Sequence, residues 1–181
     1  MSVSIPNIFK DIVSNLEVNK RVNFKCDTYG KIMQSLESDK KVIDKKNKVY
    51  PLVILIHDFE EKYNNESKDF DIDNLNFLIC NLSNPNWYAE QRYKNNIEPI
   101  LNPIYEALIS GIASSPYFIN NGLISHKKKI DLNTGTNEGK AAYYLPDFLD
   151  GIWVKDLALR AKYQDCSQLN GKSQNGIKIY K

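Results

Sequence analysis

The amino-terminal part of the chain has the clearest helical pattern. Ser4 is suited to cap a helix, and Pro6 fits the first turn, where its missing N–H costs nothing. We therefore expect an amphipathic helix that packs on another element through one apolar face. Its apolar residues recur every three or four positions: Ile5, Ile8, Phe9, Ile12, Val13 and Leu16.

Three segments have the patterns of β-strands. Residues 22–28 alternate between apolar and polar, as a half-buried strand does. Residues 52–56 are apolar at every position, which is typical of a central strand covered on both faces. The segment 69–83 alternates and then becomes continuously apolar at 77–80. We expect it to pair with the previous strand as a hairpin, through the polar residues 61–68.

A strong helical stripe is interrupted by prolines. A proline inside a helix removes a hydrogen bond and clashes with the preceding turn, at a cost of about 3 kcal/mol. Pro99 and Pro103 therefore predict either one helix from Tyr88 to Ile112, bent around residues 96–103, or two helices that meet there. The stripe consists of Ile97, Ile100, Leu101, Ile104, Tyr105, Leu108 and Ile112.

The carboxyl-terminal third predicts one further strand. Residues 152–163 alternate, with an irregularity at Lys155 and Asp156 that suggests a β-bulge. We expect residues 126–150 to form a long loop or arm, and residues 164–181 to form a polar tail outside a single domain at 1–163. The element order predicts an α+β fold, in which a small, mostly antiparallel sheet carries an amino-terminal helix and a long proline-bent helix.

Composition and charge exclude several classes of protein. No apolar run approaches the roughly 18 residues of a membrane span, and no secretory signal is visible, so we expect synthesis in the cytoplasm. Three widely spaced cysteines without a C-x-x-C pair argue against a disulfide framework and a zinc site. A net charge of +2 is too small for a dedicated nucleic-acid-binding protein, although a local basic patch remains possible.

Residues 57–61 hold the best candidate for metal chemistry. His57, Asp58, Glu60 and Glu61 follow the apolar strand, and a metal-dependent hydrolase built on them is one hypothesis. Strand alternation divides this set between two faces, so a solvated strand end is the preferred interpretation. The spacing of Asp69, Asp71 and Asp73 lacks the glycine and glutamate of a calcium loop. We therefore predict no catalytic residue, metal or cofactor, and no enzymatic activity.

Two groups of residues are candidates for contact with other molecules. The basic cluster of His126, Lys127, Lys128 and Lys129 is either a solvated loop or a contact with DNA phosphates. The second group carries aromatic rings and one arginine that we expect in contacts with a neighbouring subunit or partner, unless Trp87 closes the turn before the helix or lies in the core. Its members are Trp87, Tyr88, Arg92, Tyr93, Tyr143 and Tyr144.

The stretch from Tyr50 to Leu159 resembles a group of proteins from tailed phages and prophages of Bacteroides-type bacteria. The shared pattern is carried by Asn84-Pro85-Asn86-Trp87, Arg92, Pro99-Ile100-Leu101, Pro103-Ile104-Tyr105 and Asp150-Gly151-Ile152. The element order is also similar to that of phage tail terminator and tail-completion proteins. The long loop and the polar tail depart from the compact terminator pattern.

This resemblance implies a structural role in the virion. The subunits would form a homo-oligomeric ring, a hexamer or else a dodecamer, between the portal or connector and the tail proteins. DNA would pass through the centre and touch the lumen without sequence specificity, and the resemblance brings no catalytic residue. Rigid prolines would then fix the angle of a wedge-shaped subunit that closes into a ring by head-to-tail contacts.

Overall fold

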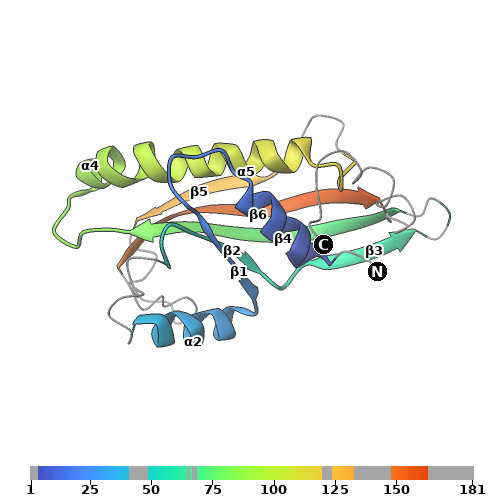
Figure 1. Ribbon diagram of the computed structural model, residues 1–181, viewed down its shortest axis with the longest axis horizontal. Coiled ribbons are helices and arrows are strands. Elements are labelled where there is room, and N and C mark those ends of the chain that lie inside the picture. Colours follow the sequence, from blue (N-terminus) through green and yellow to red (C-terminus); the bar gives the residue numbers. More distant parts are fainter. Residues whose placement is uncertain are drawn as a thin grey trace, which may run out of the picture.

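A six-stranded mixed sheet is the central element of the protein (Figure 1). The computed structural model describes residues 4–40, 49–64, 66, 69–119, 124–132 and 148–162. The strands run in the order β1-β2-β4-β6-β5, and β3 pairs with β4 beyond the end of β2. Only β1 and β2 pair in parallel. The strands are β1 (Asn23–Asp27), β2 (Leu52–Ile56), β3 (Glu60–Asn64), β4 (Asp69–Leu82), β5 (Lys127–Leu132) and β6 (Leu149–Lys162).

Helices lie on both faces of this sheet (Figure 1). α1 (Ile5–Ser14) and a long joined helix cover one face, and α2 (Tyr29–Lys40) covers part of the other. The long helix consists of α4 (Ala89–Arg92), the π-helical segment η1 (Tyr93–Leu101) and α5 (Asn102–Ser114). No helix among the described residues is long and apolar enough to cross a membrane. The α+β fold class predicted from the sequence is confirmed.

Strand β2 explains why the core has two halves. All five of its residues are buried, and alternate side chains point to opposite faces. Val53 and Leu55 join the cluster under α1 and α5, whereas Leu52, Ile54 and Ile56 join the cluster over α2. The continuous apolar run therefore marks a strand covered on both sides, as predicted.

The two prolines change the hydrogen-bond register of the long helix without breaking it. Pro99 lies inside η1, where the bonds span five residues, and the N–H of Asn102 still bonds to Ile97 O. Pro103 lies in the first turn of α5, where its missing N–H is tolerated. Figure 1 shows one continuous helix over the sheet, so of the two alternatives the single helix is the one found.

The predicted irregularity in the last strand is confirmed. The pairing of β4 with β6 shifts register between Ile72 and Leu75 and again between Leu75 and Phe77. Asn74 and Asp156 both have positive φ angles, of 62° and 55°. One extra residue on each strand restores the register, so both strands bend while their apolar faces stay on the core.

Three elements differ from the prediction. α2 was missed, because its apolar positions are few and Gly30 lowers its helix propensity. The residues of β3 were predicted to be a polar strand end and a turn, because they show no alternation of apolar and polar positions, and the structure leaves all of them exposed. The expected loop at residues 126–150 is wrong at both ends, because Lys127–Leu132 forms the edge strand β5 and β6 already begins at Leu149. The predicted tail 164–181 lies outside the described residues.

Candidate functional site

A buried ion pair joins the start of the long helix to the start of β6. Arg92 is 5 % exposed and Asp150 is 0 % exposed. Arg92 Nη1 donates to Asp150 Oδ1 at 3.2 Å, and Arg92 Nε donates to the carbonyl of Trp87 at 3.1 Å. The guanidinium also lies over the Phe148 ring, 4.4 Å from its centroid. A charged pair held this way is fixed in one geometry by hydrogen bonds and packing.

Asn96 completes this polar cluster one helical turn further on. It is 1 % exposed, and its Nδ2 donates to Asp150 Oδ2 at 3.0 Å and to the carbonyl of Leu82 at 3.3 Å. Its Oδ1 accepts from Asn81 Nδ2 at 2.8 Å. We call Arg92, Asn96 and Asp150 the buried polar cluster. It ties the long helix to the ends of both β4 and β6.

The turn that leads into the long helix is closed by local hydrogen bonds. Asn84 Oδ1 accepts from the N–H of Asn86 at 2.9 Å, and Asn84 O accepts from the N–H of Trp87 at 3.1 Å. Gln91 Oε1 then accepts from the N–H of Tyr88 at 3.0 Å. These contacts hold the carbonyl of Trp87 where Arg92 reaches it, so the Asn-Pro-Asn segment is explained by the cluster behind it.

The predicted aromatic interface is only partly exposed. Tyr88 and Tyr93 are 83 % and 39 % exposed, and Trp87 is half-buried. The assignment of Arg92 to this surface is wrong, because its side chain is buried against Asp150. Tyr143 and Tyr144 lie outside the described residues. Of the six residues in this prediction, Tyr88 and Tyr93 are the ones that the structure shows exposed.

The basic cluster lies on the edge strand β5 and on the residue before it. Each lysine has a local partner: Lys127 Nζ lies 2.7 Å from Asp156 Oδ2, Lys129 Nζ lies 3.7 Å from Asp131 Oδ2, and Lys128 Nζ donates to Asn102 Oδ1 at 3.0 Å. The hydrogen bond to Asp156 raises the pKa of Lys127. Contacts of such exposed groups are weak, so the lysines can still exchange partners.

His126 is held against α5 beside the same strand. Its Nε2 lies 2.7 Å from the Tyr105 hydroxyl, and Lys128 Nζ lies over the Tyr105 ring at 4.0 Å from its centroid. Burial raises the pKa of Tyr105, with a smaller contribution from the charge of Glu106. The tyrosine therefore stays a neutral hydroxyl, and His126 serves to fix β5 against the helix.

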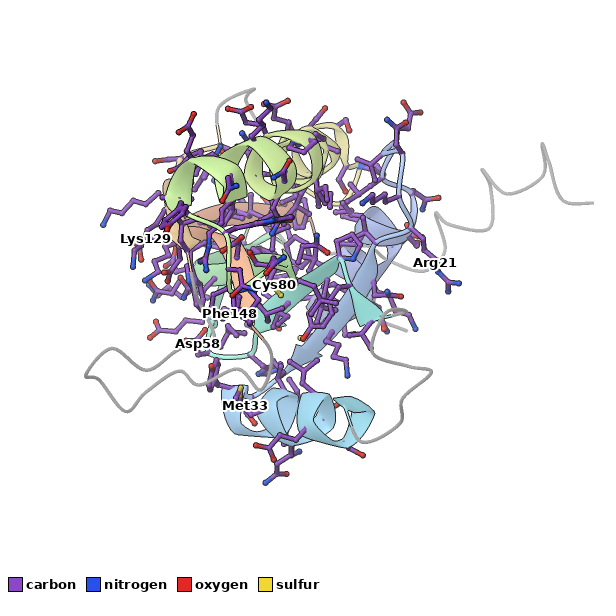
Figure 2. The ribbon with its side chains drawn as sticks, turned by 90° about the vertical axis from the view of Figure 1, so that its left-hand side faces the viewer. Arg21, Met33, Asp58, Cys80, Lys129 and Phe148 are labelled. Atoms are coloured by element: carbon purple, nitrogen blue, oxygen red, sulfur yellow. The ribbon has the colours of Figure 1, made fainter. Side chains whose placement is uncertain are left out.

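A second basic group was missed by the sequence analysis. Lys10, Lys20 and Arg21 line a groove of about 570 Å³ between α1 and β1, whose apolar floor includes Val22 and Phe24. No acidic residue lines this groove, and no described residue pairs with its three cations. Figure 2 shows Arg21 and Lys129 on opposite sides of the molecule. The sequence showed only the adjacent Lys20 and Arg21, because Lys10 lies ten residues earlier on another element.

The structure does not gather the residues proposed for a metal. His57 and Asp58 are exposed between β2 and β3, and the His57 ring packs on Phe59 with 4.9 Å between centroids. Glu60 and Glu61 follow on β3. Within the described ranges, no three His, Cys, Asp or Glu side chains form a group that would hold a metal ion. The described segments around His57 therefore have the geometry of a solvated strand connection.

Cys26 is the half-buried one of the two cysteines among the described residues. Burial raises the pKa of the Cys26 thiol to about 11, with a smaller contribution from the negative charge of Asp27. The reactive thiolate is therefore scarce near neutral pH. Cys26 packs as a small apolar residue of β1.

Comparison with other proteins adds no assignment to this geometry. A scan against protein-family models found no family that matches the chain, and a search of curated proteins found no relative.

Proposed function

We propose that this chain is a structural subunit of a tailed-phage virion, which forms an oligomeric ring at the joint between head and tail. The proposal rests on where the structure places two polar residues of the pattern shared with the phage proteins. Arg92 and Asp150 bind each other in the interior, 58 positions apart, instead of facing a cleft. Residues used in this way set the shape of a subunit.

The shape in question is a long helix held at a defined position on a sheet. The buried polar cluster fixes its first turns, and the packing of α1 against α5 fixes its last turns. Pro99 and Pro103 lie between these two attachments, and Asn96 of the cluster is itself part of the π-helical segment. A ring subunit needs this kind of rigidity, because a small error in the angle of each contact prevents closure.

The proposal includes the ring size, the neighbours and the contact with DNA. We propose a hexamer, or a dodecamer, that lies between the portal or connector and the tail proteins within the virion. DNA passes through its centre and meets basic side chains without sequence readout. The three cations of the groove between α1 and β1 support this part of the proposal, because no acidic side chain of the described residues competes for them.

Native mass spectrometry and negative-stain electron microscopy of the full chain test the proposal. We expect a ring with a central opening, either in the protein alone or after the connector protein is added. A monomer under both conditions would contradict it. Tight DNA binding by such a monomer would favour a nucleic-acid-binding module instead, and heat on titration with Mg²⁺, Mn²⁺ or Zn²⁺ would revive the hydrolase hypothesis.

A further inference from the structure

Three strands of the described residues pair on one side only: β5 on one border of the sheet, and β1 and β3 on the other. Among the described residues, β5 pairs only with β6 and β3 pairs only with β4. β6 and β3 lie on opposite sides of β4, so the free edges of β5 and β3 face away from each other. Figure 1 shows β3 near one end of the sheet and β5 toward the other. Such edges are templates for pairing with another chain.

The edges of β5 and β3 have opposite net charge, with three lysines and one aspartate on β5 and two glutamates and one lysine on β3. β5 reads KKKIDL, and its three lysines are exposed. β3 reads EEKYN, and all of its residues are exposed. Like charges placed directly opposite each other destabilise a strand pair, whereas opposite charges stabilise it. The pattern therefore disfavours pairing of β5 with β5 or of β3 with β3, and favours pairing of β5 with β3.

The strand directions fit an antiparallel contact. β5 is antiparallel to β6, β6 to β4, and β4 to β3, so β5 runs parallel to β4 and opposite to β3. A second copy that continues the sheet in the same orientation would bring its β3 antiparallel to β5. This is the arrangement in which directly opposed side chains interact most closely.

The two faces of the sheet also match. Lys128 contacts Asn102 on α5, and Glu61 is opposite the core residue Ile72, so both side chains point to the face that carries the long helix. Lys129 is opposite Trp153, which packs on the α2 side. Glu60 alternates with Glu61 and points to that same side.

We propose that β5 of one copy pairs with β3 of the next, so that the lysines of β5 meet Glu60 and Glu61 of β3. The inference rests on the proposed ring, and it says which surfaces of neighbouring subunits form the ring contact. Two different surfaces meet, so the contact is head-to-tail and continues until the ring closes. Because β5 and β3 lie toward opposite ends of the long strands, neighbouring copies are staggered, as strands are in a barrel.

Charge reversal tests this contact with two variants of the full chain. The first, Lys128→Glu/Lys129→Glu, reverses β5, and the second, Glu60→Lys/Glu61→Lys, reverses β3. We expect each variant alone to lose the ring, because the two edges of every contact then carry net charges of the same sign. An equimolar mixture of the two should restore a ring with an even number of alternating subunits. Native mass spectrometry measures both results, and thermal melting by circular dichroism verifies folding.

Matched controls reverse exposed charges away from both edges. Lys31→Glu/Lys94→Glu and Glu37→Lys/Glu90→Lys change net charge by the same amounts, and we expect both to assemble like the wild type. If the wild type forms rings and the edge variants do too, the strand contact is wrong while the ring proposal stands. Edge variants that do not reassemble when mixed would also overturn the pairing. A wild type that stays monomeric would overturn both proposals, and the charges would then serve to block pairing.

Discussion

Arg92 Nη1 and Asp150 Oδ1 lie 3.2 Å apart in the interior, so the long helix and β6 are joined by a charge pair that water does not reach. Such a pair contributes less to stability than its geometry suggests, because both ions lose their hydration. It has a strong effect on specificity, since a helix placed elsewhere would leave two buried charges unpaired. Each half of the pair therefore depends on the other.

Removal of the Arg92 side chain alone should strongly destabilise the fold. We expect Arg92→Met to lower the free energy of unfolding by about 3–5 kcal/mol, because Asp150 is then a buried charge without its cation. The double variant Arg92→Met/Asp150→Leu should recover much of this loss. Urea denaturation measures both, with the exposed Lys94→Met as the control for loss of a cation. A double variant as unstable as the sum of its parts would contradict this account.

An isosteric change at Asn96 tests the cluster by charge alone. Asn96→Asp would replace the Nδ2 donor with a carboxylate oxygen that faces Asp150 Oδ2, now 3.0 Å away. We expect a loss of about 3 kcal/mol or more at pH 7. The loss should shrink as the pH falls, because protonation removes the repulsion. The control is Asn95→Asp at an exposed position of the same helix, and an equal effect at both positions would contradict the prediction.

The contact between α1 and α5 depends on a missing side chain. A Cβ at Gly111 would lie 3.1 Å from Ile12 Cγ2 and 3.6 Å from Leu16 Cδ2. We expect Gly111→Leu to cost about 1–3 kcal/mol, because the larger side chain forces the helices apart. Ala113→Leu, on the exposed face of α5, should change stability by only about 0.5 kcal/mol or less. Thermal melting compares the two, and equal shifts would exclude close packing at Gly111.

The thiol of Cys26 should react slowly. Its pKa is raised from 9.0 to about 11, so at pH 8 the thiolate fraction falls about 100-fold. In a Cys80→Ala/Cys166→Ser variant, we expect Ellman's reagent to modify the folded protein far more slowly than the urea-unfolded one. The folded rate should keep rising between pH 9 and 11. The same protonation stabilises the fold below pH 9 and is lost as the pH rises to 11. A rate that levels off near pH 9 would contradict the raised pKa.

Contact with DNA should depend more on the groove than on the edge strand. Lys10→Gln/Lys20→Gln/Arg21→Gln removes cations that form no ion pair with a described residue, whereas the lysines of β5 are partly compensated by Asp131 and Asp156. We expect this variant to weaken binding to duplex DNA and to reduce its salt dependence, because fewer counterions are released. Fluorescence anisotropy across a salt series measures both. A larger effect from Lys127→Gln/Lys128→Gln/Lys129→Gln would place the DNA on β5 instead.

The parts of the fold that were predicted correctly all have local periodicity. The stripe of α1, the continuous apolar run of β2 and the alternation of β4 each reflect a face that is buried along the whole element. β3 has no such face because all of its residues are exposed, and in β5 only Ile130 and Leu132 pack on the core, so both edge strands depend on pairing with β4 and β6. Their sequences therefore resemble loops.

In the candidate site, too, sequence reasoning failed where a residue's partners are distant along the chain. Arg92 was placed on the surface because charged side chains are rarely buried without a partner. The partner exists, but Asp150 is 58 residues away and becomes a neighbour only when β6 pairs with β4. The groove between α1 and β1 likewise combines Lys10 with Arg21 from elements that meet only in the folded chain.

The sequence by itself determined the α+β class and the irregularity near Asp156, and it limited the stripe with Pro99 and Pro103 to one bent helix or two helices that meet, because each depends on neighbours within a few residues. Only the tertiary structure decided that Arg92 is buried, that residues 127–132 form an edge strand, and that opposite charges occupy opposite borders of the sheet. Those facts depend on which distant segments pack together, and that is decided by the burial of the whole core.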